Sequence, residues 1–324
     1  MSSTTSSLSK KQLKSIFSNY DLGEVCSFLP KVHGQKNTNY FVTVSKNKPV
    51  KKNSAPSETD DFVLTLLEND HQLNSFLKPL LKSCTKAGLP VPRLCPTKTG
   101  ALESSFNNQT IFICSRIRGQ HVFNPTLAQC ASIGRFLARF HLANAAHEAS
   151  PQNFHAEQLL QQAEKVRAHM PPADANLLHD SISGVRSMLA RSDLHNLPKG
   201  LIHGGLSRDG VLFNERGLSG VQDFHRAENS FWMLDLAVAV NDWCVVGNGA
   251  LNINQARVLI GAYHQIRSLT KEEFWYFPLF LLFAAVNSWL EHLNSLICSE
   301  KTTAFRNIVA RHVSRPFHLQ VRQL

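Results

Sequence analysis

The chain has 324 residues, of which 43% are hydrophobic and 18% are charged, and its formal net charge is +10. This composition is typical of a folded protein and excludes wholesale disorder. The length exceeds the roughly 150 residues of an average domain, so two lobes with separate cores are expected. The basic charge admits a nucleic-acid partner, but Lys and Arg are spread along the chain and no nucleic-acid-binding motif is present. An anionic small ligand explains the charge equally well.

The cysteines and apolar stretches indicate the compartment. Seven cysteines are scattered without a C-x-x-C spacing, which argues against disulfides and structural zinc and predicts a reducing, cytoplasmic environment. The N-terminal residues lack the apolar core of a signal peptide. The most apolar stretch, 274–290, contains Pro278 and Asn287 and predicts a buried helix, so no membrane contact is expected.

The first part of the chain predicts a sheet with packed helices. Ser9 and Gln12 have the spacing of a capping box at the start of a helix. Runs of β-branched and aromatic residues predict strands, and apolar residues at helical spacing predict helices. The predicted strands are 39–44, 61–67 and 109–115, and the predicted helices are 10–20 and 71–87. A polar loop over 45–60 joins the first two strands.

The second part is predicted to be mainly helical. Its candidate helices are 126–146, 156–169 and 176–190. Two short apolar runs, at 211–213 and 218–221, flank Gly217 and predict a small hairpin. Arg118 and Gly119 mark a predicted hinge, and we expect an N-terminal lobe over 1–115 and a C-terminal lobe over 116–324.

The residues just before and after this hairpin form the most informative motif. His203-Gly-Gly-Leu-Ser-Arg-Asp-Gly-Val-Leu-Phe213 is followed ten residues later by Asp223-Phe224. This arrangement resembles the H-x-D-x-x-x-x-N loop and metal-binding aspartate of kinases. In such a loop the Asp orients or deprotonates the substrate hydroxyl, and the Asn binds Mg²⁺. Here Gly205 and Gly210 stand at those two positions.

Several other segments, taken together in this order, resemble the homoserine kinase family, which shares its fold with aminoglycoside phosphotransferases and choline kinases. The matching segments are 20–24, 37–43, 62–66, 88–92, 136–143 and 235–244. The resemblance implies an α+β, two-lobed, protein-kinase-like fold of the aminoglycoside phosphotransferase type. The reaction it implies is ATP-dependent phosphorylation of L-homoserine, or of another small hydroxyl-bearing amino acid, in threonine biosynthesis.

The resemblance also implies roles for particular residues. Asp223 is the expected Mg²⁺ ligand, while Asn37, Thr38 and Asn39 lie where the family's nucleotide-covering hairpin is expected and are the candidate contacts to ATP. His203 and Asp235 are expected to brace the loop rather than to react. A departure lies at 287–293, where the family pattern R-F-W-L-S-R-L is replaced by Asn-Ser-Trp-Leu-Glu-His-Leu.

The two glycines leave three interpretations open. The loss of a general base typically costs about 10²- to 10⁴-fold in rate, which favours an impaired, pseudokinase-like protein. A working kinase would need a substitute base, for which Asp209 is the first candidate and His225 the second. The third interpretation is a basic protein associated with nucleic acid, which the absence of a recognised motif makes the least favoured.

Overall fold

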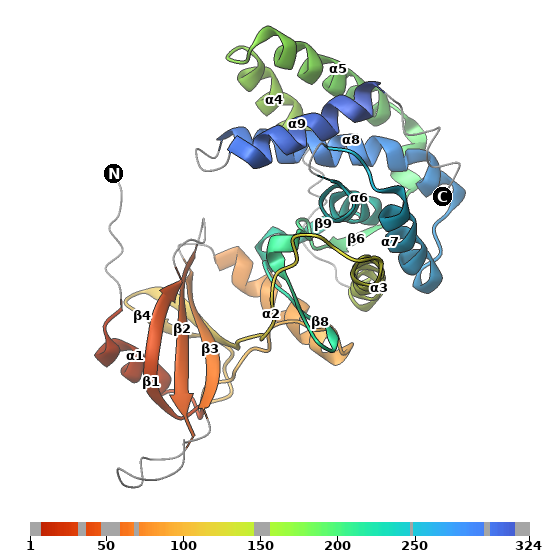
Figure 1. Ribbon diagram of the computed structural model, residues 1–324. Helices are drawn as coiled ribbons and strands as arrows, with labels where there is room; N and C mark the ends of the chain where they lie inside the picture. The colour runs from red at the N-terminus through yellow and green to blue at the C-terminus, as the bar shows by residue number, and fades with distance from the viewer. Residues whose placement is uncertain are drawn as a thin grey trace. The chain divides into compact units, whose positions relative to one another are not determined.

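The computed structural model describes residues 8–31, 37–46, 59–67, 71–145, 156–246, 249–294 and 299–314. The chain divides into two compact units, Met1–Arg118 and Gly119–Leu324. In Figure 1 the elements of the first unit are coloured red to yellow, and those of the second follow from α3 to the blue C-terminal helices.

The first unit is built on a five-stranded antiparallel sheet with the strand order β1-β2-β3-β5-β4. Its strands are β1 (Glu24–Lys31), β2 (Asn37–Ser45), β3 (Thr59–Leu67), β4 (Ser104–Phe106) and β5 (Gln109–Ser115). Its helices are α1 (Lys10–Phe17) and α2 (His71–Lys86). The predicted strands and helices are therefore confirmed within a few residues, whereas β1 and β4 have no counterpart among the predictions.

The core of this unit lies between the sheet and α1. Alternate residues of β2, β3 and β5 are buried with one face of the helix, because successive strand side chains point to opposite faces. The buried set includes Tyr40, Val42, Leu64 and Ile113 of the sheet with Leu13, Ile16 and Phe17 of α1. The predicted capping box is present, since Ser9 and Gln12 each bond the other's backbone amide. The cap fixes where α1 begins.

The second unit is mainly helical. Its helices are α3 (Leu127–Ala143), α4 (Ala156–Arg167), α5 (Pro172–Leu189), α6 (Trp232–Trp243), α7 (Ile253–Ile266), α8 (Lys271–Asn294) and α9 (Ser299–Ser314). Two small antiparallel pairs complete it, β6 (Lys199–Ile202) with β9 (Glu228–Phe231) and β7 (Val211–Asn214) with β8 (Gly217–Val221). The predicted hairpin around Gly217 is thus confirmed, and the mixed α+β class with it.

Helix packing in the second unit depends on one close approach. A Cβ added to Gly134 of α3 would lie 2.1 Å from the carbonyl oxygen of Leu259 in α7. Only glycine leaves room for two backbones at this distance. The contact therefore fixes how α3 and α7 cross.

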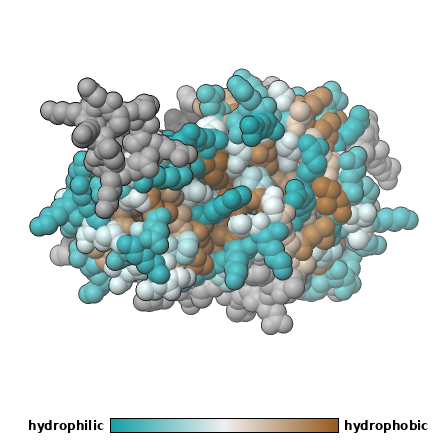
Figure 2. All heavy atoms as spheres, turned by 90° about the horizontal axis from the view of Figure 1, so that it is seen from below, coloured by the Kyte–Doolittle hydropathy of each residue, from teal (hydrophilic) through white to brown (hydrophobic). Residues whose placement is uncertain are grey.

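Helix α8 is the apolar stretch recognised in the sequence. Within the described residues, the segment Lys271–Leu293 alone is long and apolar enough to cross a membrane, but 72% of its most apolar window is buried inside the protein. Pro278 lies inside this helix and is itself buried. The burial is that of a core helix, as predicted. On the face shown in Figure 2, hydrophilic and hydrophobic residues are interspersed.

Candidate functional site

The loop over residues 203–210 connects β6 to β7, and a buried carboxylate holds its first residues. Asp235 of α6 is fully buried. Its Oδ2 accepts from the backbone amide of His203 at 2.8 Å, and its Oδ1 accepts from the amide of Gly204 at 3.0 Å. The expectation that Asp235 braces the loop is confirmed.

A chain of buried side chains keeps Asp235 ionised. His141 donates from Nε2 to Asp235 Oδ2 at 3.1 Å, and its Nδ1 accepts from the Tyr263 hydroxyl at 2.8 Å. Burial alone would raise the pKa of Asp235, but the bonds from His141 and the loop outweigh it and hold this pKa below its usual value. Burial also lowers the pKa of His141, which fixes the neutral ring and the direction of these bonds.

His203 is a structural residue. Its ring is fully buried, and Nε2 donates to the carbonyl oxygen of Gln222 at 2.8 Å. Burial lowers the pKa of His203, so the ring is neutral and is unsuited to act as an acid at the surface. The expected bracing role is confirmed, because the bond ties the loop to the segment that precedes Asp223.

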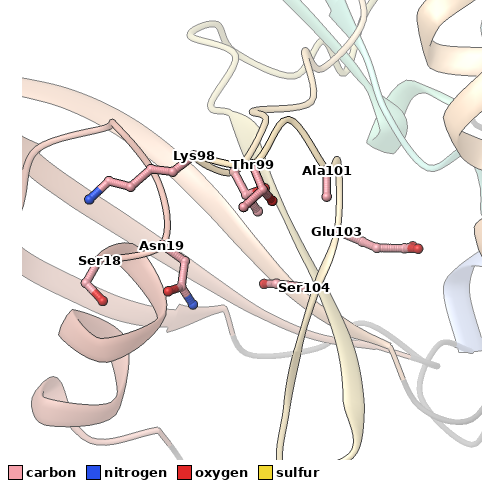
Figure 3. A pocket seen from close by; sticks show the side chains of 8 residues that line it. Ser18, Asn19, Lys98, Thr99, Ala101, Glu103 and Ser104 are labelled. Atoms are coloured by element: carbon pink, nitrogen blue, oxygen red, sulfur yellow. The ribbon is translucent and has the colours of Figure 1, made fainter.

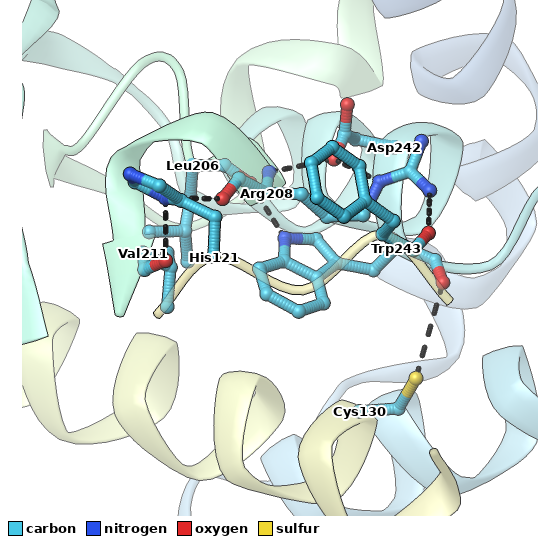
Figure 4. A network of polar contacts seen from close by, with 8 residues as sticks. His121, Cys130, Leu206, Arg208, Val211, Asp242 and Trp243 are labelled. Atoms are coloured by element: carbon cyan, nitrogen blue, oxygen red, sulfur yellow. Dashed lines mark hydrogen bonds and ion pairs between the residues drawn. The ribbon is translucent and has the colours of Figure 1, made fainter. Parts of the chain in front are cut away.

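The C-terminal turn of α6 holds the second half of the loop (Figure 4). Asp242 Oδ1 accepts from the amide of Arg208 at 2.8 Å and from its Nε at 3.1 Å. Trp243 donates from Nε1 to the carbonyl oxygen of Leu206 at 3.0 Å. His121 Nδ1 lies 3.1 Å from the carbonyl oxygen of Val211. A single helix therefore supports the loop from both of its ends.

The position expected to carry the metal-binding Asn faces Asp223. A Cβ added to Gly210 would lie 3.2 Å from Asp223 Oδ2, so an Asn there would meet the carboxylate directly. Asp223 is exposed and has left-handed backbone angles, φ 64° and ψ 38°. A non-glycine residue rarely adopts such angles, and they concentrate at functional sites. The structure thus brings Asp223 and position 210 together.

The donor set suits a metal held by one protein carboxylate. Among the described residues, no group of three or more His, Cys, Asp or Glu side chains could hold a metal ion. Gly210 offers no side-chain oxygen. Mg²⁺ is often bound through one or two carboxylates together with substrate phosphates and water. Asp223 therefore suits Mg²⁺ as the one side-chain ligand that remains from the motif, and it would bind the ion more weakly than the Asp and Asn pair.

The position expected to carry the catalytic Asp is covered by an arginine. A Cβ added to Gly205 would lie 2.6 Å from Cδ of Arg226. Arg226 in turn donates from Nη1 to Glu291 Oε2 of α8 at 2.8 Å. An aspartate at position 205 would require this side chain to move.

Asp209, the candidate substitute base, lies on the short 3₁₀ turn Arg208–Gly210 and is exposed. Its charge acts on Asp242. Burial raises the pKa of Asp242, the bonds from Arg208 oppose this rise, and Asp209 adds to it. The role of Asp209 as a base stays a prediction. The side chain of His225 lies outside the described residues.

The candidate nucleotide contacts lie in the first unit, at the start of β2. Thr38 and Asn39 pair with Leu66 and Thr65 of β3. The side chain of Asn39 is tied to its neighbour strand, because Thr65 Oγ1 donates to Asn39 Oδ1 at 2.7 Å. Asn37 begins the strand, but its side chain lies outside the described residues. Nucleotide binding by these three residues stays a prediction.

The first unit also contains a shallow polar hollow (Figure 3). Its volume is about 230 Å³, and Ser18, Asn19, Lys98 and Glu103 are among its lining residues. Figure 3 shows Lys98 and Glu103 pointing in opposite directions, so their charges do not converge on one ligand. None of the residues predicted from the sequence lines this hollow.

Sequence reasoning missed the residues that act across the fold. Asp242 and Trp243 belong to a segment recognised by its resemblance, but no role was predicted for them. Arg226 and Glu291 are 65 residues apart and meet only in three dimensions. The replacement of the family pattern over 287–293 was the one available signal for Glu291.

Comparison with known proteins agrees with the predicted resemblance. The model of the phosphotransferase enzyme family matches residues 29–269. The homoserine kinase of Methylobacillus flagellatus is 32% identical over 297 residues, covering 91% of this chain and 88% of that protein. The similarity therefore extends across both units.

Solved structures share the fold at low sequence identity. An aminoglycoside phosphotransferase of Alicyclobacillus acidocaldarius has a TM-score of 0.72 and 14% identity, covering 99% of this chain and 98% of that one. An amicoumacin kinase in complex with AMP-PNP and Ca²⁺ has a TM-score of 0.69 and 12% identity, covering 96% of each chain. The predicted aminoglycoside phosphotransferase-like fold is confirmed.

Proposed function

Because this chain belongs to the phosphotransferase enzyme family and is a relative of homoserine kinases, we propose that it is a homoserine kinase-like protein with impaired phosphotransfer. The family reaction is ATP-dependent phosphorylation of L-homoserine in threonine biosynthesis. In this proposal the chain is cytoplasmic and keeps the ability to bind ATP and a small hydroxyl-bearing amino acid such as L-homoserine.

The observation that carries this proposal is a contrast within the 203–210 loop. The hydrogen bonds that hold the loop in place are present, but the side chains that would take part in the reaction are missing. The bonds from Asp235, Asp242 and Trp243 to the loop are all present. Gly205 and Gly210 nevertheless offer neither a base nor an oxygen for Mg²⁺. A loop kept in shape without its reactive groups suits binding better than turnover.

The expected loss is large because two independent contributions are absent. A positioned general base contributes about 10²- to 10⁴-fold in rate. The loose transition state of phosphoryl transfer reduces this dependence, because position and metal charge carry much of the catalysis. Of the two side chains with which the motif holds the metal, only Asp223 is present here, so the second contribution is weakened as well.

A working kinase is the second candidate, and the exposure of Asp209 favours it. A carboxylate next to the vacant Asn position could complete the metal shell or serve the substrate hydroxyl. Asp209→Asn separates the two candidates, because it abolishes turnover only in a kinase that depends on this residue.

The experiment measures ADP formation and nucleotide binding on the same preparation. Purified protein is incubated with ATP, Mg²⁺ and L-homoserine, and ATP binding is followed separately by calorimetry. We expect binding with turnover at least about 10²-fold below the 1–100 s⁻¹ common for kinases. Turnover within that range would show that phosphotransfer is not impaired.

A further inference from the structure

The turn after Asp223 packs directly on the loop. Gly204 has φ +74°, and a Cβ added to it would lie 2.3 Å from the carbonyl oxygen of Arg226. At Gly205 an added Cβ would lie 2.6 Å from Cδ of Arg226 and 3.5 Å from its Nε. The Arg226 side chain therefore occupies the space that an aspartate at position 205 would need.

This packing reverses the charge at the vacated position. A carboxylate at position 205 would repel a phosphate group, whereas a guanidinium attracts one. Arginine remains charged at all physiological pH values and presents N–H donors in a planar fork. The loss of the aspartate thus leaves a cationic group where the kinase motif has an anionic one.

Glu291 satisfies only one part of this fork. Its Oε2 accepts from Arg226 Nη1 at 2.8 Å, and its Oε1 accepts from Asn287 Nδ2 at 3.1 Å. Among the described residues, Arg226 Nε and Nη2 have no hydrogen-bond partner. These two atoms form one edge of the guanidinium, the edge that can bind a phosphate through two parallel bonds.

The ion pair is exposed enough for a ligand to compete with it. The side chains of Arg226 and Glu291 are 42% and 36% exposed. Such pairs contribute little to stability, so opening or sharing this one costs little. The half-exposed guanidinium is therefore accessible to a small anion.

We propose that Arg226 makes the vacated catalytic position a binding site for the phosphate group of a small phosphomonoester, with Glu291 as its internal competitor. This inference rests on the proposed function in one respect, since it assumes that position 205 belongs to a phosphotransfer loop. The ligand class is the phosphorylated form of a small hydroxy amino acid, and the terminal phosphate of a nucleotide shares the same chemistry.

The test is calorimetric titration of the full chain without Mg²⁺, so that no metal bridges the anion to Asp223. The probes are O-phospho-L-homoserine, ATP, inorganic phosphate and unphosphorylated L-homoserine. We expect O-phospho-L-homoserine to bind and Arg226→Ala to weaken it roughly 10- to 100-fold. ATP binding that loses as much affinity in Arg226→Ala would instead identify a nucleotide as the source of the phosphate.

Two further variants give results that a structural arginine would not. Glu291→Gln removes the competing charge and should tighten phosphomonoester binding about threefold or more. Arg226→Lys keeps the charge but loses the fork, so it should retain part of the affinity. Arg216→Ala is the matched control, because Arg216 is an exposed arginine beside the β7–β8 turn, and binding should not change.

The inference is overturned if no phosphate-bearing probe binds the natural chain, or if folded Arg226→Ala and Glu291→Gln bind like the natural chain. Circular dichroism shows whether each variant is folded, and the Lys variant replaces the Ala variant if the latter is not. Failure of the proposed function gives a different result, because it appears as kinase turnover in the assay with ATP and Mg²⁺.

Discussion

Replacement of Asp235 by Asn should lower the stability of the folded protein far more than the small difference in side-chain volume suggests. The carboxylate accepts three hydrogen bonds, at 2.8 and 3.0 Å from the loop amides and at 3.1 Å from His141. Asn has one acceptor oxygen, and its amide group would face a donor. At least one backbone N–H, that of the buried His203 or that of the half-buried Gly204, is then left without an acceptor.

The expected cost follows from these contacts. A buried donor without a partner costs about 1–3 kcal/mol, and bonds to a charged acceptor are roughly twice as strong as neutral ones. The loss of one bond and the weakening of two others together destabilise the folded state by about 3 kcal/mol, within the range for breaking a buried charge network.

The assay is urea denaturation of the natural chain and Asp235→Asn, followed by far-UV circular dichroism. Asp180→Asn is the control, because it makes the same chemical change at an exposed position on α5 and should alter stability by less than about 0.5 kcal/mol. A change below about 1 kcal/mol for Asp235→Asn would refute the argument that this carboxylate holds the loop.

Three further outcomes are expected. Gly205→Asp should change stability by less than about 0.5 kcal/mol, because the clash is with the flexible, exposed side chain of Arg226, which can move aside; a loss above about 2 kcal/mol in urea denaturation would show that Arg226 is held in place. Burial raises the pKa of Glu228 from 4.5 to about 7, so the folded state binds a proton that the unfolded state releases between these values, and stability should fall as pH rises through that window. Glu228→Gln should remove this pH dependence, which is worth about 1–2 kcal/mol after allowance for partial exposure. Urea denaturation at pH 5 and pH 8 measures it, and a variant whose stability changes between these pH values as much as that of the natural chain would contradict the prediction. Gly134→Ala should cost about 2–4 kcal/mol, because its methyl group would lie against the backbone of α7, and a thermal shift of less than about 1 °C would show that the helices can separate at no cost.

Local sequence patterns predicted the elements whose signal is carried within one segment. The capping box placed the start of α1, and the β-branched runs placed β2, β3 and β5. Strands β6 and β9 were missed because each has four residues and is defined by its partner rather than by a pattern of its own. Helix α7 was also missed, although Asn252 caps it in the expected manner.

The residues of the candidate site that belong to the loop motif could be predicted from the sequence. Those that reach the loop through tertiary packing could not. The motif identified position 205, position 210 and Asp223, and the structure brings the last two together. Arg226 could not be assigned from the sequence, because its importance comes from the path of the turn over Gly204 and Gly205. Glu291 reaches the same place from α8, which no local pattern reveals.

The measurement that tests the central claim most directly is the rate of ATP- and Mg²⁺-dependent phosphorylation of L-homoserine before and after the missing groups are restored. The restored chain carries Gly205→Asp and Gly210→Asn together with Arg226→Ala, which opens the space for the new carboxylate. We predict at least about a 10²-fold gain in turnover over the natural chain, and a smaller gain when Arg226 is kept. An unrestored chain that already works at an ordinary kinase rate, or a folded restored chain that gains nothing, would contradict the account.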